Sequence, residues 1–260
     1  MPDIARLDAA ARRLRELHQI GRPLLLVNVW DPASAGAVAA AGSPAVATSS
    51  VAMAAARGGS DANRDREAAF AQLRQITAGV DVPVTADLEG GYDLAPGDLV
   101  DALLDAGAVG CNIEDTDHAT GDRLLDAEPR AAYLAAIRVA ANQRGVGIVL
   151  NARIDAIIRH PQCDPAAAMD EVLRRARLYL DAGADCVYPI SLRDPALVAR
   201  VVKELDRPVN VNPSEPLAAL AEAGAARISL GGGVHHWVIG ELERRARRLL
   251  AGDATAFASP

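Results

Sequence analysis

Short apolar runs typical of buried strands alternate with amphipathic helical stretches along almost the whole chain. The strands are predicted at 24–29, 45–49, 82–89, 109–114, 147–153, 185–190, 208–212 and 226–231. After a leading helix within residues 1–20, the helices are predicted at 33–41, 64–79, 97–106, 129–144, 165–182, 195–205, 216–223 and 234–251. Residues 53–63, between the second strand and its helix, are predicted to form an irregular loop.

The number of these units favours one fold class. Eight β/α units close a parallel barrel in about 250 residues, and the chain has 260. A doubly wound sheet is the alternative, but its first strand is usually followed by a glycine-rich turn. Here the first strand ends in NVWDPAS (28–34), without a GxGxxG pattern. We therefore expect residues 1–260 to form a single (β/α)₈ (TIM) barrel domain with an additional N-terminal helix.

Composition excludes several classes of function. The net charge of −7 is spread along the chain, which argues against a nucleic-acid partner. Lysine occurs only as Lys203, on a predicted helix outside the barrel. Enzymes that form a Schiff base need a lysine in their site, so Schiff-base aldolase and pyridoxal-phosphate chemistry are disfavoured.

Cysteine use and hydropathy indicate a cytoplasmic protein. Cys111, Cys163 and Cys186 are scattered and odd in number, unlike a disulfide framework. The N-terminus lacks the continuous apolar segment of a signal peptide. No run approaches the roughly 20 apolar residues of a membrane span, so no membrane association is expected.

Acidic residues gather at the predicted ends of the third and fourth strands. Asp87 and Glu89 share one strand face by alternation, and Glu114 ends the next strand. In a barrel, these strand ends meet at the face where active sites lie. Converging carboxylates repel one another unless a cation intervenes, and oxygen ligands suit Mg²⁺ or Mn²⁺. We therefore expect Asp87 to bind the metal directly, with Glu89 and Glu114 acting through water. The alternative interpretation is a set of solvated acids at the starts of helices.

With these motifs in view, the sequence resembles the isocitrate lyase/phosphoenolpyruvate mutase superfamily nearly end to end. VTADLEGGYD (84–93) resembles its Asp-x-Asp-x-Gly-Tyr/Phe-Gly metal motif, with Glu89 in place of the second aspartate. NIEDTDH (112–118) resembles the Glu-Asp strand end, which implies that Glu114 belongs to the outer metal shell. Members of the superfamily exchange their last helix within a tetramer. The resemblance therefore implies a homo-oligomer, a dimer or tetramer, with the last helix swapped between subunits.

The resemblance also implies the residues that bind a carboxylate substrate. NARIDA (151–156) makes Arg153 the catalytic anchor of the substrate carboxylate. TSSV (48–51) matches the segment whose backbone N–H groups bind a 2-oxo acid, and RGGSDAN (57–63) supplies a further catalytic acid. VNPSE (211–215) provides substrate contacts. The substrate-binding set is Ser49, Ser50, Val51, Asp87, Arg153, Asn212 and Ser214, and the further acid is Asp61.

The loop after the fourth strand separates the possible reactions. Superfamily lyases carry Lys-Lys/Arg-Cys-Gly-His there, with the cysteine as catalytic acid, whereas residues 114–129 contain neither Cys nor Lys. Decarboxylation of oxaloacetate needs least from this loop, because CO₂ departs once the enolate is stabilised. It needs one proton donor, for which His235, Tyr188 and His118 are candidates. The glycines at 231–233 could instead cradle a phosphate.

The sequence thus predicts a Mg²⁺-dependent lyase acting on a small 2-oxo or 2-hydroxy acid through a metal-stabilised enolate. Oxaloacetate decarboxylation is the most specific hypothesis. Hydrolytic cleavage of oxaloacetate and a divergent C–C lyase reaction follow it. The alternatives are a phosphonopyruvate-type mutase or hydrolase, which acts on a P–C bond, and a carboxylate-binding barrel without turnover.

Overall fold

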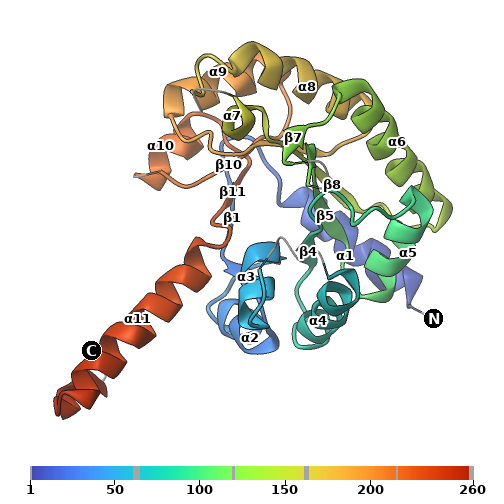
Figure 1. The fold of residues 1–260 in the computed structure, drawn as a ribbon. Helices are drawn as coiled ribbons and strands as arrows, with labels where there is room; N and C mark the ends of the chain where they lie inside the picture. The colour runs from blue at the N-terminus through green and yellow to red at the C-terminus, as the bar shows by residue number, and fades with distance from the viewer. Residues whose placement is uncertain (1, 61–64, 119–120, 161–163, 215, 258–260) are drawn as a thin grey trace.

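The structure is a computed structural model that describes residues 2–60, 65–118, 121–160, 164–214 and 216–257. Its parallel strands form a barrel that is surrounded by helices (Figure 1). The described strands are β1 (Leu24–Leu26), β2 (Asn28–Val29), β3 (Val46–Thr48), β4 (Val84–Asp87), β5 (Gly110–Glu114), β6 (Thr116–Asp117), β7 (Arg123–Leu124), β8 (Val149–Ile154), β9 (Cys186–Pro189), β10 (Asn210–Val211) and β11 (Arg227–Ser229).

Strand pairing closes the barrel. One sheet has the order β2-β3-β4-β5-β8-β9 and a second has the order β1-β11-β10. The two sheets join at a parallel bridge between Val187 and Val209, and at Val27, which alone separates β1 from β2. Counting β1 and β2 as one strand, the described residues provide the eight strand positions expected for a (β/α)₈ barrel.

Helices follow the strands as the apolar pattern predicts. The described helices are α1 (Ile4–Glu16), α2 (Pro32–Ala40), α3 (Ser50–Ala56), α4 (Arg66–Ala78), α5 (Pro96–Asp105), α6 (Ala127–Gln143), α7 (Ala156–Arg159), α8 (Met169–Asp181), α9 (Pro195–Leu205), α10 (Leu217–Glu222) and α11 (Gly233–Leu250), with a 3₁₀ turn at Ala254–Phe257. As predicted, Lys203 lies exposed on α9, outside the barrel.

One local expectation was wrong. The irregular loop predicted at 53–63 begins instead with α3, because Ser49 caps an alanine-rich segment of high helix propensity. The loop after β5 forms a short antiparallel hairpin, in which Thr116 pairs with Leu124 and Asp117 with Arg123. Both segments lie at the carboxyl ends of barrel strands.

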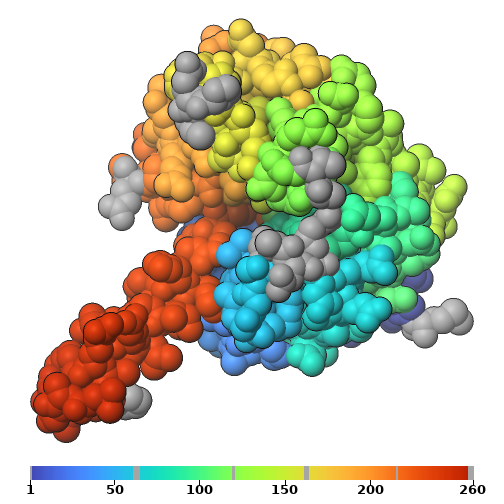
Figure 2. All heavy atoms as spheres, in the orientation of Figure 1, coloured from blue at the N-terminus to red at the C-terminus, as the bar shows by residue number. Residues whose placement is uncertain are grey.

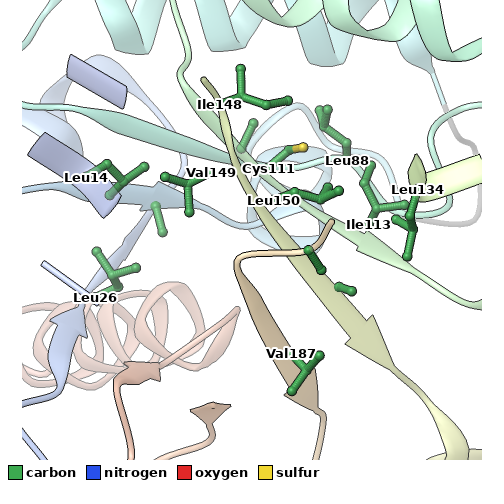
Figure 3. Packing of buried hydrophobic residues seen from close by; sticks show 14 of the residues in the cluster. Leu14, Leu26, Leu88, Cys111, Ile113, Leu134, Ile148, Val149, Leu150 and Val187 are labelled. Carbon is green, nitrogen blue, oxygen red and sulfur yellow. The ribbon is translucent and has the colours of Figure 1, made fainter. Parts of the chain in front are cut away.

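Small aliphatic side chains fill the core between strands and helices. Figure 3 shows Cys111, Ile113 and Leu150 close together, and all three are buried. Cys111 and Cys186 are free and buried, and Cys163 lies outside the described residues.

Helix α1 packs near the amino ends of the strands. Leu14 contacts β5 so closely that a Cβ at Gly110 would lie 2.8 Å from the leucine side chain. Arg15 donates hydrogen bonds to the carbonyls of Gly147 and Ile148, just before β8. Helix α1 therefore leaves the carboxyl ends of the strands uncovered, and active sites of such barrels lie at those ends.

Helix α11 projects away from the barrel (Figures 1 and 2). None of its described residues is buried. Trp237 is 69% exposed and Leu242 is 61% exposed. An apolar pocket of about 890 Å³ lies beside its base, lined by α2, β1 and the first turns of α11 itself. No helix among the described residues is both long and apolar enough to span a bilayer.

Candidate functional site

Asp87 lies at the carboxyl end of β4 and contacts the first residue of α3. One carboxylate oxygen of Asp87 accepts hydrogen bonds from the Ser50 backbone N–H at 3.2 Å and from the Ser50 hydroxyl at 3.0 Å. The Asp87 N–H donates to the hydroxyl of Thr48, at the end of β3. Asp87 and the Ser49–Val51 segment are therefore parts of one site.

Glu89 occupies a turn beyond the strand. The prediction that Asp87 and Glu89 share one strand face was wrong, because strand β4 ends at Asp87. The backbone of Glu89 has a φ of 51°, in the left-handed region that non-glycine residues rarely adopt. Its side chain is nevertheless buried, and its carbonyl accepts a hydrogen bond from the Glu114 N–H at 2.9 Å. The turn places Glu89 beside the end of β5.

Glu114 and Arg153 form a buried ion pair across neighbouring strands. They are register partners on β5 and β8, and Arg153 Nη1 lies 2.5 Å from Glu114 Oε2. The other Glu114 oxygen contacts His118 Nε2. Burial raises the pKa of Glu114, while His118 and Arg153 oppose this increase. Burial lowers the pKa of Arg153, but nearby carboxylates outweigh it and keep the net pKa above its usual value.

Asp155 fixes Arg153 from the other side. Arg153 Nε donates to Asp155 Oδ1 at 2.7 Å, and Nη2 donates to Oδ2 at 3.2 Å. The hydroxyl of Thr116 also donates to Asp155. Asp155 is fully buried. Arg153 is thus held in one orientation at the strand end.

Asp115 holds the backbone of Asp155 in place. It accepts hydrogen bonds from the Asp155 N–H at 2.8 Å, from Tyr179 at 2.8 Å and from Arg175 at 3.0 Å. Neither Asp115 nor Asp155 was among the site residues predicted from the sequence. Their position directly after strands that carry site residues was the available signal.

The remaining predicted substrate residues lie on the other side of the barrel mouth. Ser49 caps α3 and Val51 is exposed. A Cβ at Gly232, the N-cap of α11, would lie 3.5 Å from Val51 and 3.6 Å from the Ser49 hydroxyl. Residues 49–51, which follow β3, therefore lie next to the start of α11, which follows β11.

Asn212 and Tyr188 form a second group at the mouth. The Asn212 amide N–H donates to the Tyr188 hydroxyl at 2.9 Å, and its oxygen accepts from the Ser191 N–H. Burial raises the pKa of Tyr188 to about 12. The Ser214 hydroxyl is buried and has no hydrogen-bond partner among the described residues.

The candidate proton donors differ in their contacts. His118 contacts Glu114, whereas His235 lies in the first turn of α11 with its ring 4.9 Å from that of Trp30. Among the described residues, no hydrogen bond or ion pair joins His235 to the acids at the strand ends. Asp61 lies outside the described residues.

The acids at the mouth have the donor chemistry that Mg²⁺ requires. In the described part of the chain, no group of three His, Cys, Asp or Glu side chains is already gathered around one point. Mg²⁺ usually keeps several waters and binds through one or two carboxylates. Within the described residues, the Asp87 carboxylate accepts hydrogen bonds only from Ser50, so Asp87 fits a direct ligand. Buried Glu89 and Glu114 fit ligands that act through water.

The chain is similar to known proteins over almost its full length. Residues 14–250 match the model of the phosphoenolpyruvate phosphomutase family. An uncharacterised protein of Mycobacterium tuberculosis is 33% identical over 83% of this chain and 80% of its own length. A crystal structure from Burkholderia cenocepacia, assigned as a phosphonomutase, superposes with a TM-score of 0.85 and 38% identity, covering 95% of this chain and 99% of that one.

A more distant structure shares the fold alone. Oxaloacetate acetylhydrolase bound to oxalate superposes with a TM-score of 0.83 at 19% identity, covering 96% of this chain and 89% of that one. Together with the barrel and its strand-end acids, the family match confirms the resemblance seen in the sequence. The chain belongs to the phosphoenolpyruvate phosphomutase family, within the isocitrate lyase/phosphoenolpyruvate mutase superfamily of lyases and mutases.

Proposed function

We propose that this chain is a Mg²⁺-dependent lyase that acts on a small 2-oxo or 2-hydroxy acid, with oxaloacetate decarboxylation as its reaction. The observation that carries the proposal is the fixed guanidinium of Arg153 between Glu114 and Asp155. A rigid cation beside an acid cluster suits a substrate whose carboxylate pairs with the arginine.

Each residue group has a role in this reaction. Arg153 orients the substrate carboxylate, and the N-terminus of α3 at Ser49–Val51 offers N–H groups to the same anion. Asp87 holds Mg²⁺, with Glu89 and Glu114 binding its waters. When bound, Mg²⁺ supplies positive charge to the 2-oxo group and so favours the enolate. Asp61 is proposed as a further acid from the family motif.

Loss of CO₂ leaves the bonding electrons on C3, where one proton must be added to give pyruvate. Among the candidate donors, His118 has the strongest support, because it contacts Glu114 at the site. Tyr188 is held by Asn212 and keeps its proton at neutral pH. His235 remains a candidate on its position after β11. With His118 or Tyr188 as the proton donor, the reaction does not need the catalytic cysteine of the superfamily lyases, which is missing from residues 114–129.

A phosphonopyruvate-type mutase or hydrolase is the second candidate. The similarity to the Burkholderia cenocepacia protein assigned as a phosphonomutase favours it. The acidic side chains of the β5–α6 loop oppose it, because Asp117 and Asp122 repel a phosphonate. A carboxylate-binding barrel without turnover is the proposal outside enzymology.

We further propose that the protein is a cytoplasmic homo-oligomer, a dimer or tetramer, in which α11 is exchanged between subunits. The exposed apolar side chains of α11 and the apolar pocket beside its base support this proposal. A helix from a second copy is the occupant that would cover both surfaces.

Pyruvate release with and without Mg²⁺ tests the reaction. The panel contains oxaloacetate, phosphonopyruvate, 2-methylisocitrate and 2,3-dimethylmalate, with lactate dehydrogenase and NADH as the readout. We expect Mg²⁺-dependent pyruvate from oxaloacetate, corrected for the reaction without enzyme. Asp87→Ala should lower the rate at least 100-fold, whereas Asp105→Ala, on the exposed end of α5, should not change it.

The other outcomes separate the alternatives. Signal from phosphonopyruvate alone would support P–C chemistry. Binding of Mg²⁺ and oxalate without turnover of any acid would support the binding barrel. A near-normal rate in Asp87→Ala would contradict the metal site.

A further inference from the structure

A fully buried arginine lies inside the barrel. Arg227 belongs to β11, whose neighbours in the sheet are β1 and β10, and its exposed fraction is 0%. Its Nη2 nevertheless donates to Asn112 Oδ1 on β5, at 3.2 Å. Strand β5 is not a neighbour of β11, so the side chain must cross the barrel interior.

This charge has no carboxylate partner at ion-pair distance among the described residues. Its other contacts are neutral: Nε donates to the Ser229 hydroxyl at 2.9 Å, and Nη1 has no hydrogen-bond partner. A guanidinium does not lose its proton in proteins. Burying such a charge without a partner is costly, so it needs compensation from charges further away.

The neutral groups around Arg227 do not provide an anion. Within the described part of the chain, Asn210, its register partner on β10, has both amide atoms without a hydrogen-bond partner, and Asn151 has an oxygen without one. Such a mixture of donors and acceptors suits ordered water. The positive charge therefore acts beyond its immediate contacts.

The nearest acidic layer is the candidate site. Asn112, which accepts from Arg227, is the register partner of Asp87 on the neighbouring strand. It also lies two residues before Glu114, on the same face of β5. Burial lowers the pKa of Arg227, and several charges, that of Asp87 among them, oppose the decrease. Arg227 and the mouth acids are thus separated by one layer of side chains.

We propose that Arg227 is a positioning residue that sets the electrostatic potential of the site from inside the barrel, strengthening anion binding and moderating Mg²⁺ affinity. This inference rests on the proposed function, because it concerns the same site. Five acids lie at the mouth (Asp87, Glu89, Glu114, Asp115 and Asp155), and Arg153, Arg175 and His118 offset only part of their charge. A buried positive charge below them keeps an anionic substrate from being repelled.

The inference predicts opposite changes in two affinities. Removing one positive charge that lies one layer of side chains from a site alters binding by roughly threefold to tenfold in a protein interior. In Arg227→Met, Mg²⁺ should bind at least threefold more tightly, whereas oxalate should bind Mg²⁺-saturated protein at least threefold more weakly. Arg227→Lys keeps the charge and should stay within twofold of the unaltered protein for both.

Calorimetric titration of Mg²⁺ alone, and then of oxalate into Mg²⁺-saturated protein, measures both quantities without turnover. Arg200→Met removes an exposed arginine on α9 and serves as the matched control. Asn112→Asp is a second test that retains Arg227. Its carboxylate would pair with the guanidinium, so both affinities should change as in Arg227→Met.

The results distinguish this inference from the proposed function. If the unaltered protein binds neither Mg²⁺ nor oxalate, both fail. If it binds both, but the two affinities fall together or do not change in folded Arg227→Met, the electrostatic role of Arg227 is wrong while the proposed function stands. If Arg227→Met does not fold, the same criteria apply to Asn112→Asp.

Discussion

Glu114 shows that one side chain at the site serves two competing partners. It pairs with Arg153 and His118 in the structure, yet its position also suits the outer metal shell. A buried carboxylate can leave one cationic partner at low cost only if another cation takes that partner's place. The two ion pairs compensate the charge of this buried acid in the structure.

The contact between His118 and Glu114 makes the stability of the protein depend on pH. Hydrogen bonds to Glu114 and Asp122 raise the pKa of His118 from 6.5 to about 9 despite partial burial. Because the pKa is raised in the folded state, the stabilisation is complete below about pH 6.5 and is lost as the pH rises through about 9. After allowance for solvent screening, we expect His118→Asn to lose about 1–2 kcal/mol of unfolding free energy at pH 6, and much less at pH 10.

Two measurements check this expectation in metal-free protein. Urea unfolding of both proteins at pH 6 and pH 10 gives the stability difference. Nuclear magnetic resonance titration of the imidazole gives the pKa itself, and a midpoint near 6.5 would contradict the ion pairs. Asp105→Asn, which removes an exposed acid with no such contact, controls for the general effect of pH.

At the scale of elements, α3 links helix capping to the site. The Ser49 side chain accepts from the Ala52 N–H, and the next residue holds Asp87. Residues 53–56 were predicted as part of an irregular loop, but they are helical. A helix start at this position presents N–H groups and the positive end of the helix dipole to an anion.

Ser49→Ala therefore has two expected effects. Loss of the cap should destabilise the protein by about 1 kcal/mol, and oxalate should bind Mg²⁺-saturated protein several-fold more weakly. Asp3→Ala removes the corresponding cap of α1, where Asp3 accepts from the Arg6 N–H at 3.1 Å. This control should lose similar stability but keep its affinity for oxalate. Chemical denaturation and calorimetry measure the two quantities, and equal oxalate affinities in both variants would refute the role of α3.

At the scale of the whole molecule, α11 is the element that a single barrel does not cover. It leaves the barrel at Gly232 and extends into solvent (Figure 2). Its exposed apolar residues lie beside an apolar pocket, whose lining includes Trp30, Val38 and Trp237. Apolar surface of this kind marks an interaction site in soluble proteins.

Charge on that helix should dissociate the proposed oligomer. We expect Trp237→Glu combined with Leu242→Glu to convert a dimer or tetramer into a monomer, because both side chains are exposed in one chain and covered only by a second. Light scattering after size-exclusion chromatography measures the mass. Ile4→Glu, at an exposed apolar residue on α1, should leave the mass unchanged. A monomer before any substitution would overturn the exchange of α11.

The sequence alone determined the order of strands and helices, because hydrophobic period depends on local burial. It also placed Asp87, Glu114 and Arg153 at strand ends, where alternation remains valid. Alternation failed at Glu89, because the chain turns once β4 has ended. Only the tertiary structure joined Asp115 to Asp155, and Arg227 to Asn112. Those contacts connect residues on different strands or across the barrel interior, and no local pattern records which distant side chains the closed barrel brings together.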